Sequence, residues 1–153
     1  MTPEGFLNPV DESLEEQKKK DKVEREWEIA ETISQGWLEA YQAGEITFGK
    51  LVNKLPLAVE KLSDRKRWLL LGEVIDKALK ASPPQLGKKK PKTPSWIRDV
   101  AVELVDMAVE KDGYKLSVSS NRSAFVFVAD LLVDHGVVDK LSPDTVENWY
   151  YSY

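Results

Sequence analysis

The chain contains 153 residues, of which 42% are hydrophobic and 31% charged, with one histidine and no cysteine. A chain of this length can bury a substantial core, either in one domain or in two small ones. The lack of cysteine excludes disulfides, zinc–thiolate centres, iron–sulfur clusters and cysteine nucleophiles.

The formal charge of −4 is distributed unevenly along the chain. Residues 1–93 carry 17 Lys and Arg against 16 Asp and Glu, whereas residues 94–153 carry five against ten. An acidic surface repels nucleic acid, so this asymmetry bears on which partner the C-terminal part would bind.

The N-terminal segment MTPEGFLNPVDESLEEQ has neither the basic region nor the apolar region of a signal peptide. No apolar run in the sequence approaches the roughly 20 residues that cross a bilayer. We therefore expect a cytoplasmic protein without membrane contacts.

Residues 1–12 contain two prolines and a glycine, and we expect an extended or disordered tail there. From Ser13 to Ala43, apolar residues recur every three or four positions, which predicts one long amphipathic helix. The residues of this stripe are Val23, Trp27, Ala30, Ile33, Trp37, Ala40 and Tyr41. Because the stripe is close to a heptad repeat, it permits a homodimer through this helix.

A second helical segment is expected from Thr47 to Leu62, with a kink or break at Pro56, because proline removes a backbone donor. Ser63 and Asp64 then supply a capping start for a third helix. The predicted inner face of this helix consists of Trp68, Leu71, Gly72, Ile75, Ala78 and Leu79. Together these helices form the predicted N-terminal unit, residues 13–82.

Residues 83–94 are rich in proline and lysine, which is typical of a linker. The predicted C-terminal unit, residues 95–153, opens with a helix from Trp96 to Gly113 that has one acidic face. Tyr114 to Ser119 fits either a short strand or an extended connection, and the apolar segment SAFVFVADLLVDHG predicts a buried helix that ends at Gly136. The predicted fold class is therefore all-α, with two helical units joined by a linker.

The last segment, LSPDTVENWYYSY, has the signals of a helix start. Ser142 suits the N-cap, Pro143 suits the first helical position, and Asp144 suits the positive end of the helix dipole. The predicted inward face of this helix consists of Val146, Trp149, Tyr150 and Tyr153.

This segment follows an apolar helix containing Ala129 and a turn containing Gly136, and the whole arrangement resembles a bacterial helix-turn-helix unit. In that family the second helix enters the major groove of DNA. The resemblance implies that Val146 packs inward. It also implies that the residues facing DNA are Ser142, Thr145, Asn148 and Tyr151.

The sequence shows no catalytic signature, glycine-rich phosphate loop or nucleophile elbow, and we expect a non-enzymatic protein. The single histidine, His135, lies at a predicted helix end, where the dipole favours a cation, and we interpret it as a capping residue. With one histidine, no cysteine and carboxylates at no known ligand spacing, we expect neither a metal site nor a cofactor.

Our first hypothesis is a small bacterial or mobile-element protein that binds nucleic acid through the helix-turn-helix-like unit and the basic linker. Arg65, Lys66 and Arg67 sit in one helical turn, and KKKPK in the linker is a second basic cluster. The candidate nucleic-acid contacts are Arg65, Lys66, Arg67, Lys88, Lys89, Lys90, Arg122, Lys140, Ser142, Thr145, Asn148 and Tyr151.

The alternative is an acidic protein–protein interaction module that acts as an inhibitor or adaptor toward a basic partner. The last helix carries acidic residues and no Lys or Arg, whereas phosphate binding depends on cations. The candidate contacts for a basic partner are Asp99, Glu103, Asp106, Glu110, Asp144, Glu147 and Tyr151.

Overall fold

The computed structural model describes residues 4–80 and 95–152. This part of the chain contains no strand and folds into six helices, so the all-α prediction is confirmed. The helices are α1 (Glu4–Gln42), α2 (Phe48–Val59), α3 (Asp64–Lys80), α4 (Ser95–Asp112), α5 (Ala124–Asp134) and α6 (Pro143–Ser152).

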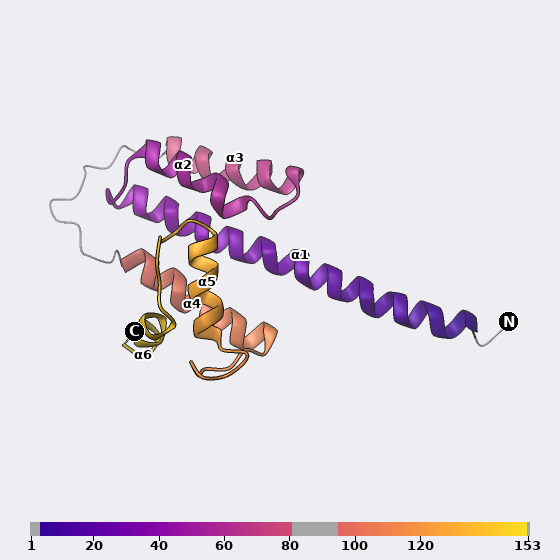
Figure 1. The fold of residues 1–153 in the computed structure, drawn as a ribbon. Helices are drawn as coiled ribbons and strands as arrows, with labels where there is room; N and C mark the ends of the chain where they lie inside the picture. Colours follow the sequence, from indigo (N-terminus) through magenta and orange to yellow (C-terminus); the bar gives the residue numbers. More distant parts are fainter. Residues whose placement is uncertain (1–3, 81–94, 153) are drawn as a thin grey trace.

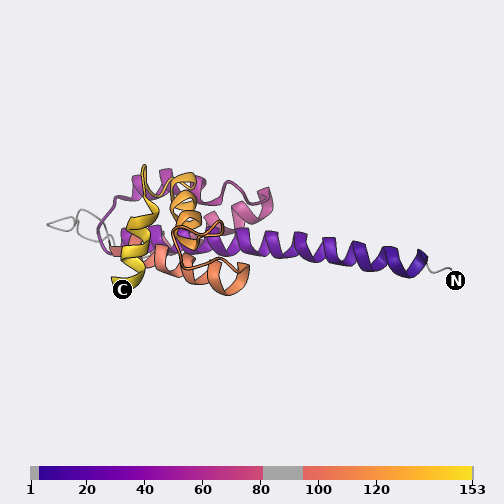
Figure 2. The same cartoon turned by 60° about the horizontal axis from the view of Figure 1, so that its bottom comes forward.

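Helix α1 is the element around which the others are arranged (Figure 1). It packs against α2 and α3 on one side and against α4 on the other, and α5 and α6 pack on α4. Its N-terminal part runs clear of the other helices in both views (Figure 2). The helix begins at Glu4, so most of the predicted tail 1–12 is helical, which follows from the low cost of extending a helix once it is nucleated.

The buried side chains form one hydrophobic core that spans both of the predicted units. At its centre α1 crosses α4, where the rings of Trp37 and Trp96 lie 4.5 Å apart between centroids. The approach is close because Gly36 has no side chain: a Cβ there would lie 2.6 Å from Cγ2 of Val100. Residues 13–80 and 95–152 therefore share one core. The predicted linker, residues 83–94, lies outside the described residues.

Of the kink or break predicted at Pro56, the break does not occur, because helix α2 continues through this residue to Val59. The carbonyl group that loses its partner belongs to Val52, which is 38% exposed, so water can satisfy it. The start of α2 behaves as predicted, since the Thr47 hydroxyl accepts a hydrogen bond from the Lys50 N–H.

Helix α3 buries a face that only partly overlaps the predicted one. Its buried residues are Leu70, Val74 and Ala78. Trp68 is 72% exposed, and Leu79 is exposed as well. The sequence of this helix has two apolar stripes, and periodicity alone does not say which of them meets α1 and α2. The side that packs is centred on Leu70, Val74 and Ala78, with Leu71 and Ile75 half-buried beside it.

The connection between α4 and α5 is irregular rather than a strand, with a single bridge between Lys115 and Ser123. Ser123 then caps α5 by accepting from the Val126 N–H. At the other end of α5 the chain turns at Gly136, whose φ of 72° favours glycine. Lys54 of α2 donates to the Gly136 carbonyl, and this hydrogen bond links the turn after α5 to α2.

Helix α6 begins as the sequence predicts. The Ser142 hydroxyl accepts from the Thr145 N–H at 3.2 Å, and Val146 is buried, as the helix-turn-helix resemblance implies. Trp149 and Tyr150 are half-buried against the core. The predicted inward residue Tyr153 lies outside the described residues.

Candidate binding surfaces

The acidic residues predicted on α4 all face outward. Asp99, Glu103, Asp106 and Glu110 are exposed along one side of the helix, while the opposite side packs into the core. This separation follows from the helical spacing of the charges, which repeats every three or four residues. The predicted stripe is therefore a real surface of the protein.

A groove of about 250 Å³ runs between this stripe and α1. Four carboxylates line it: Asp99 and Glu103 from α4, and Glu31 and Glu39 from α1. We call this feature the acidic groove. Within the part of the chain that the structure describes, no Lys or Arg nitrogen comes within 4.0 Å of any of the four.

The packing of α1 on α4 creates the acidic groove. Gly36 and Val100 lie among its lining residues, at a point where a Cβ on Gly36 would lie only 2.6 Å from Val100. Glu31 and Glu39 follow the exposed side of α1 and come next to the α4 stripe only through this crossing. Their place in the groove was not predicted, because nothing in the helical pattern of α1 indicates which helix lies beside its acidic residues.

Helix α6 lies against the same stretch of α4. The Tyr150 hydroxyl donates to the Asp106 carboxylate at 2.9 Å, and this hydrogen bond raises the pKa of Tyr150 above its usual 10.0. Asn148 and Trp149 line a shallow cavity with Asp99. Tyr151 is 64% exposed and makes an edge contact with the Tyr150 ring.

The remaining candidate acids on α6 are Asp144 and Glu147, which differ in exposure. Asp144 is exposed at the start of the helix, and Glu147 is half-buried. Neither forms an ion pair with any residue that the structure describes. The candidate contacts for a basic partner are thus carried by α4 and α6, two helices that pack on each other.

The candidate contacts for nucleic acid are more dispersed. Arg65 and Lys66 lie at the start of α3, which packs on α1 and α2, whereas α6 packs on α4 and α5. Arg67 donates to the carbonyl groups of Glu60 and Leu62 at 3.0 and 3.2 Å, so its guanidinium caps the end of the preceding segment. Lys88, Lys89 and Lys90 lie outside the described residues.

The cations predicted beside α6 are Arg122 and Lys140. Arg122 donates to the Asp112 carbonyl at 2.8 Å and lies over the Tyr114 ring. Both contacts hold its side chain against the α4–α5 connection. Lys140 is exposed. The Ser142 and Thr145 hydroxyls share a hydrogen bond of 2.8 Å and support the helix start. Helix α6 itself has no Lys or Arg.

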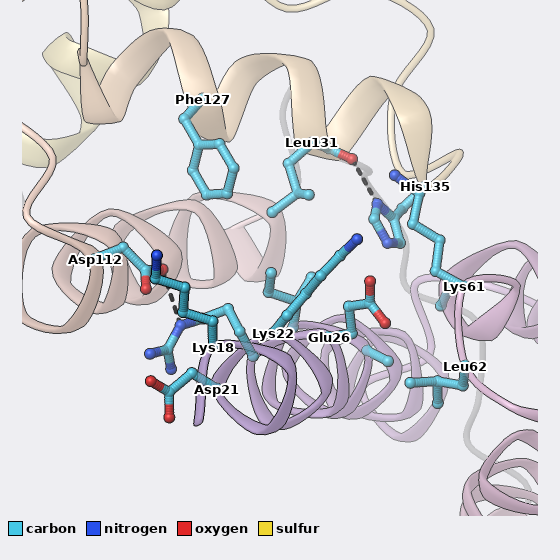
Figure 3. A pocket seen from close by; sticks show the side chains of 14 residues that line it. Lys18, Asp21, Lys22, Glu26, Lys61, Leu62, Asp112, Phe127, Leu131 and His135 are labelled. Carbon is cyan, nitrogen blue, oxygen red and sulfur yellow. Dashed lines mark hydrogen bonds and ion pairs between the residues drawn. The ribbon is translucent and has the colours of Figure 1, made fainter. Parts of the chain in front are cut away.

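A second concave site lies between α1, the end of α2 and α5 (Figure 3). Its volume is about 420 Å³, and we call it the α1–α5 pocket. One wall is held by Arg25, which donates to Asp112 at 2.8 Å and to Glu28 at 2.7 Å. Lys111 donates to the same Glu28 carboxylate, so these ion pairs join α1 to the end of α4.

His135 lies in the wall of this pocket and is only 4% exposed. It caps α5 as expected, but through its backbone N–H, which donates to the Leu131 carbonyl. The ring Nδ1 also lies 2.9 Å from that carbonyl and must carry the proton, because a carbonyl only accepts. Burial lowers the pKa of His135, so the ring is a neutral group rather than the cation that the sequence analysis expected.

The comparisons with known proteins add no assignment. No protein-family model matches the chain, and no curated protein or solved structure matches it significantly. Among the described helices, none combines the length and the apolar character needed to cross a membrane. Residues 4–80 and 95–152 contain no group of three or more His, Asp or Glu side chains placed to hold a metal ion.

Proposed function

We propose that this protein is a non-enzymatic interaction module that binds a basic protein partner through the acidic face of α4 and α6. The observation that carries the proposal is the acidic groove, where Glu31, Glu39, Asp99 and Glu103 converge without a cation within 4.0 Å in the described chain. Like charges that face one another are unfavourable, and a partner's Lys or Arg relieves this repulsion.

The charges that line the groove suit an arginine side chain. A guanidinium is planar and presents five N–H donors, which lets it bridge carboxylates from two helices at once. Asp99 and Glu103 lie on one wall and Glu31 and Glu39 on the other, so one inserted cation meets both. Summed over the acidic C-terminal part, the same charges also steer a basic partner toward this face.

Aromatic side chains beside the groove support a protein interface. Trp149 lines the cavity next to Asp99, and Tyr151 projects into solvent close to it along α6. Tyrosine and tryptophan carry a large share of the binding energy in protein interfaces. The acidic residues would then set the orientation and the aromatic residues the affinity. The partner's basic site can be one that otherwise holds phosphate, which would make this protein an inhibitor or adaptor in the cytoplasm.

Nucleic-acid binding through α6 is the competing proposal. It requires a basic surface on this protein, whereas binding of a basic partner requires an acidic one. Fluorescence anisotropy with a labelled arginine-rich peptide and, in parallel, a short DNA duplex separates them. We expect the peptide to bind and to dissociate as salt rises, and the duplex to remain free at low salt. Binding of the duplex with a steep salt dependence, without binding of the peptide, would overturn our proposal in favour of the nucleic-acid one.

A further inference from the structure

The lining of the α1–α5 pocket is largely apolar. Phe127 and Leu131 lie one turn apart on α5 and both point into it (Figure 3), and Ile29 and Leu62 are also among its lining residues. Its volume of about 420 Å³ is within the range of small-molecule sites, which combine apolar walls with a few polar groups. The body of a ligand in this pocket is therefore aromatic or aliphatic.

The charges at the mouth of the pocket favour an anion. Lys18, Lys22 and Lys61 line it, and none of them has a carboxylate within 4.0 Å in the described residues. Fewer carboxylates remain to balance them, because Asp112 is paired with Arg25. Asp21 and Glu26 are left, and Asp21 keeps its charge although it accepts from the neutral Gln17 side chain, so the three lysines leave one positive charge in excess.

His135 adds a third requirement. With its proton on Nδ1, the ring presents Nε2 as an acceptor, and no hydrogen bond to Nε2 is formed within the described chain. Figure 3 shows the ring at the end of the pocket, with Lys22, Lys61 and Glu26 around it. Nε2 is not one of the fully buried atoms that lack a partner, so solvent reaches it from the pocket, and a ligand that brings an O–H group to this point replaces that solvent with a direct hydrogen bond.

We propose that the α1–α5 pocket binds a small apolar carboxylic acid that also carries a hydroxyl group. Its apolar body packs on Phe127 and Leu131, its carboxylate lies between Lys22 and Lys61, and its hydroxyl donates to Nε2 of His135. Each of these three groups of the ligand contacts a different part of the pocket. No residue that lines this pocket also lines the acidic groove, so the two sites can be tested separately.

A matched set of three ligands tests each part of the proposal. The probes are 2-hydroxy-4-phenylbutyrate, 4-phenylbutyrate, which lacks the hydroxyl, and 4-phenylbutylamine, which reverses the charge. The chain has a single histidine, so the imidazole signal in an NMR titration of the full chain reports on His135 alone. We expect this signal to shift with the hydroxy acid, which should bind more tightly than the acid and much more tightly than the amine.

Charge reversal locates the carboxylate. Lys22 and Lys61 are exposed, so the double variant Lys22→Glu/Lys61→Glu should fold normally and weaken binding of 4-phenylbutyrate about tenfold or more. The matched control Lys20→Glu/Lys50→Glu changes two exposed lysines outside the pocket and should retain the affinity. No imidazole shift with either acid, equal affinity for the amine, or equal losses in both variants would overturn the site. A hydroxyl that adds no affinity would overturn the role of His135.

Discussion

The hydroxyl of Tyr150 donates a hydrogen bond of 2.9 Å to the carboxylate of Asp106, and this contact joins α6 to the acidic stripe of α4. The same carboxylate is one of the predicted contacts for a basic partner. The position of α6, with Trp149 and Tyr151 beside the stripe, therefore depends on packing around Val146 and on this hydrogen bond.

Removal of that link should have a small and pH-dependent cost. We expect Tyr150→Phe to lower the free energy of unfolding by about 0.5–1 kcal/mol at neutral pH, since the hydrogen bond is partly exposed. The bond raises the pKa of Tyr150, so its contribution is complete below the usual 10.0 and is lost as pH rises through the raised value. Urea unfolding of both proteins at neutral and at strongly alkaline pH checks this: the difference should disappear at the higher pH.

Substitution by alanine should change the stability of the protein in opposite directions at two helical glycines. At Gly36 the new Cβ would lie 2.6 Å from Val100 and 2.9 Å from the Trp96 ring. The overpacking, about 1–3 kcal/mol, exceeds the gain of about 1 kcal/mol in helix propensity, so Gly36→Ala should destabilise the protein. At Gly72 no atom lies within 4 Å of the Cβ position, and Gly72→Ala should stabilise it by about 0.5–1 kcal/mol. Thermal unfolding of the two variants tests the α1–α4 crossing, and a stabilising Gly36→Ala would contradict it.

Substitution of Arg67 should destabilise the protein, whereas substitution of the exposed Arg65 should not. Arg67 donates to the carbonyl groups of Glu60 and Leu62, and Arg67→Ala leaves both without this donor. We expect a loss of about 1 kcal/mol in the free energy of unfolding. Arg65 is exposed and forms no ion pair with the described residues, so Arg65→Ala should change stability by less than about 0.5 kcal/mol. Equal effects in chemical denaturation would contradict the capping role of Arg67.

The buried His135 should make stability depend on pH. Burial lowers its pKa below the ordinary value of 6.5, so the unfolded chain binds a proton more readily than the folded one. The free energy of unfolding is therefore highest, as far as His135 is concerned, above pH 6.5. It decreases as the pH falls from 6.5 toward the pKa of His135 in the folded protein. Urea unfolding between neutral pH and mildly acidic pH should show this loss in the native sequence. His135→Gln should show a flatter dependence, and parallel curves would contradict the assignment.

The sequence predicts the elements of this fold better than their faces. The start of α6 at Ser142 and Pro143 and the outward direction of the α4 acids follow from capping chemistry and helical period, both of which act within a few residues. The buried side of α3 does not, because Trp68 and Leu70 belong to two stripes that local pattern alone ranks in the wrong order. Only the neighbouring helices decide which of them is covered.

The candidate sites show the same limit. Asp99 and Glu103 are predictable as an exposed pair, but their convergence with Glu31 requires the crossing of α1 over α4, a contact between distant parts of the chain. For His135 the sequence indicates the cap and not the protonation state, because burial beside α1 and α2 sets the latter. Charges that interact across helices cannot be assigned from the periodicity of either helix.

The most direct test of the acidic groove is a pair of charge-reversal variants measured against the labelled arginine-rich peptide. Asp99→Lys/Glu103→Lys alters the groove, whereas Glu73→Lys/Asp76→Lys alters two exposed acids on α3, and each variant changes the net charge from −4 to zero. We predict that anisotropy shows at least a tenfold loss of affinity for the groove variant and less than a threefold loss for the α3 variant. Equal losses in the two variants would mean that net charge alone holds the peptide, and would contradict a partner site in the groove.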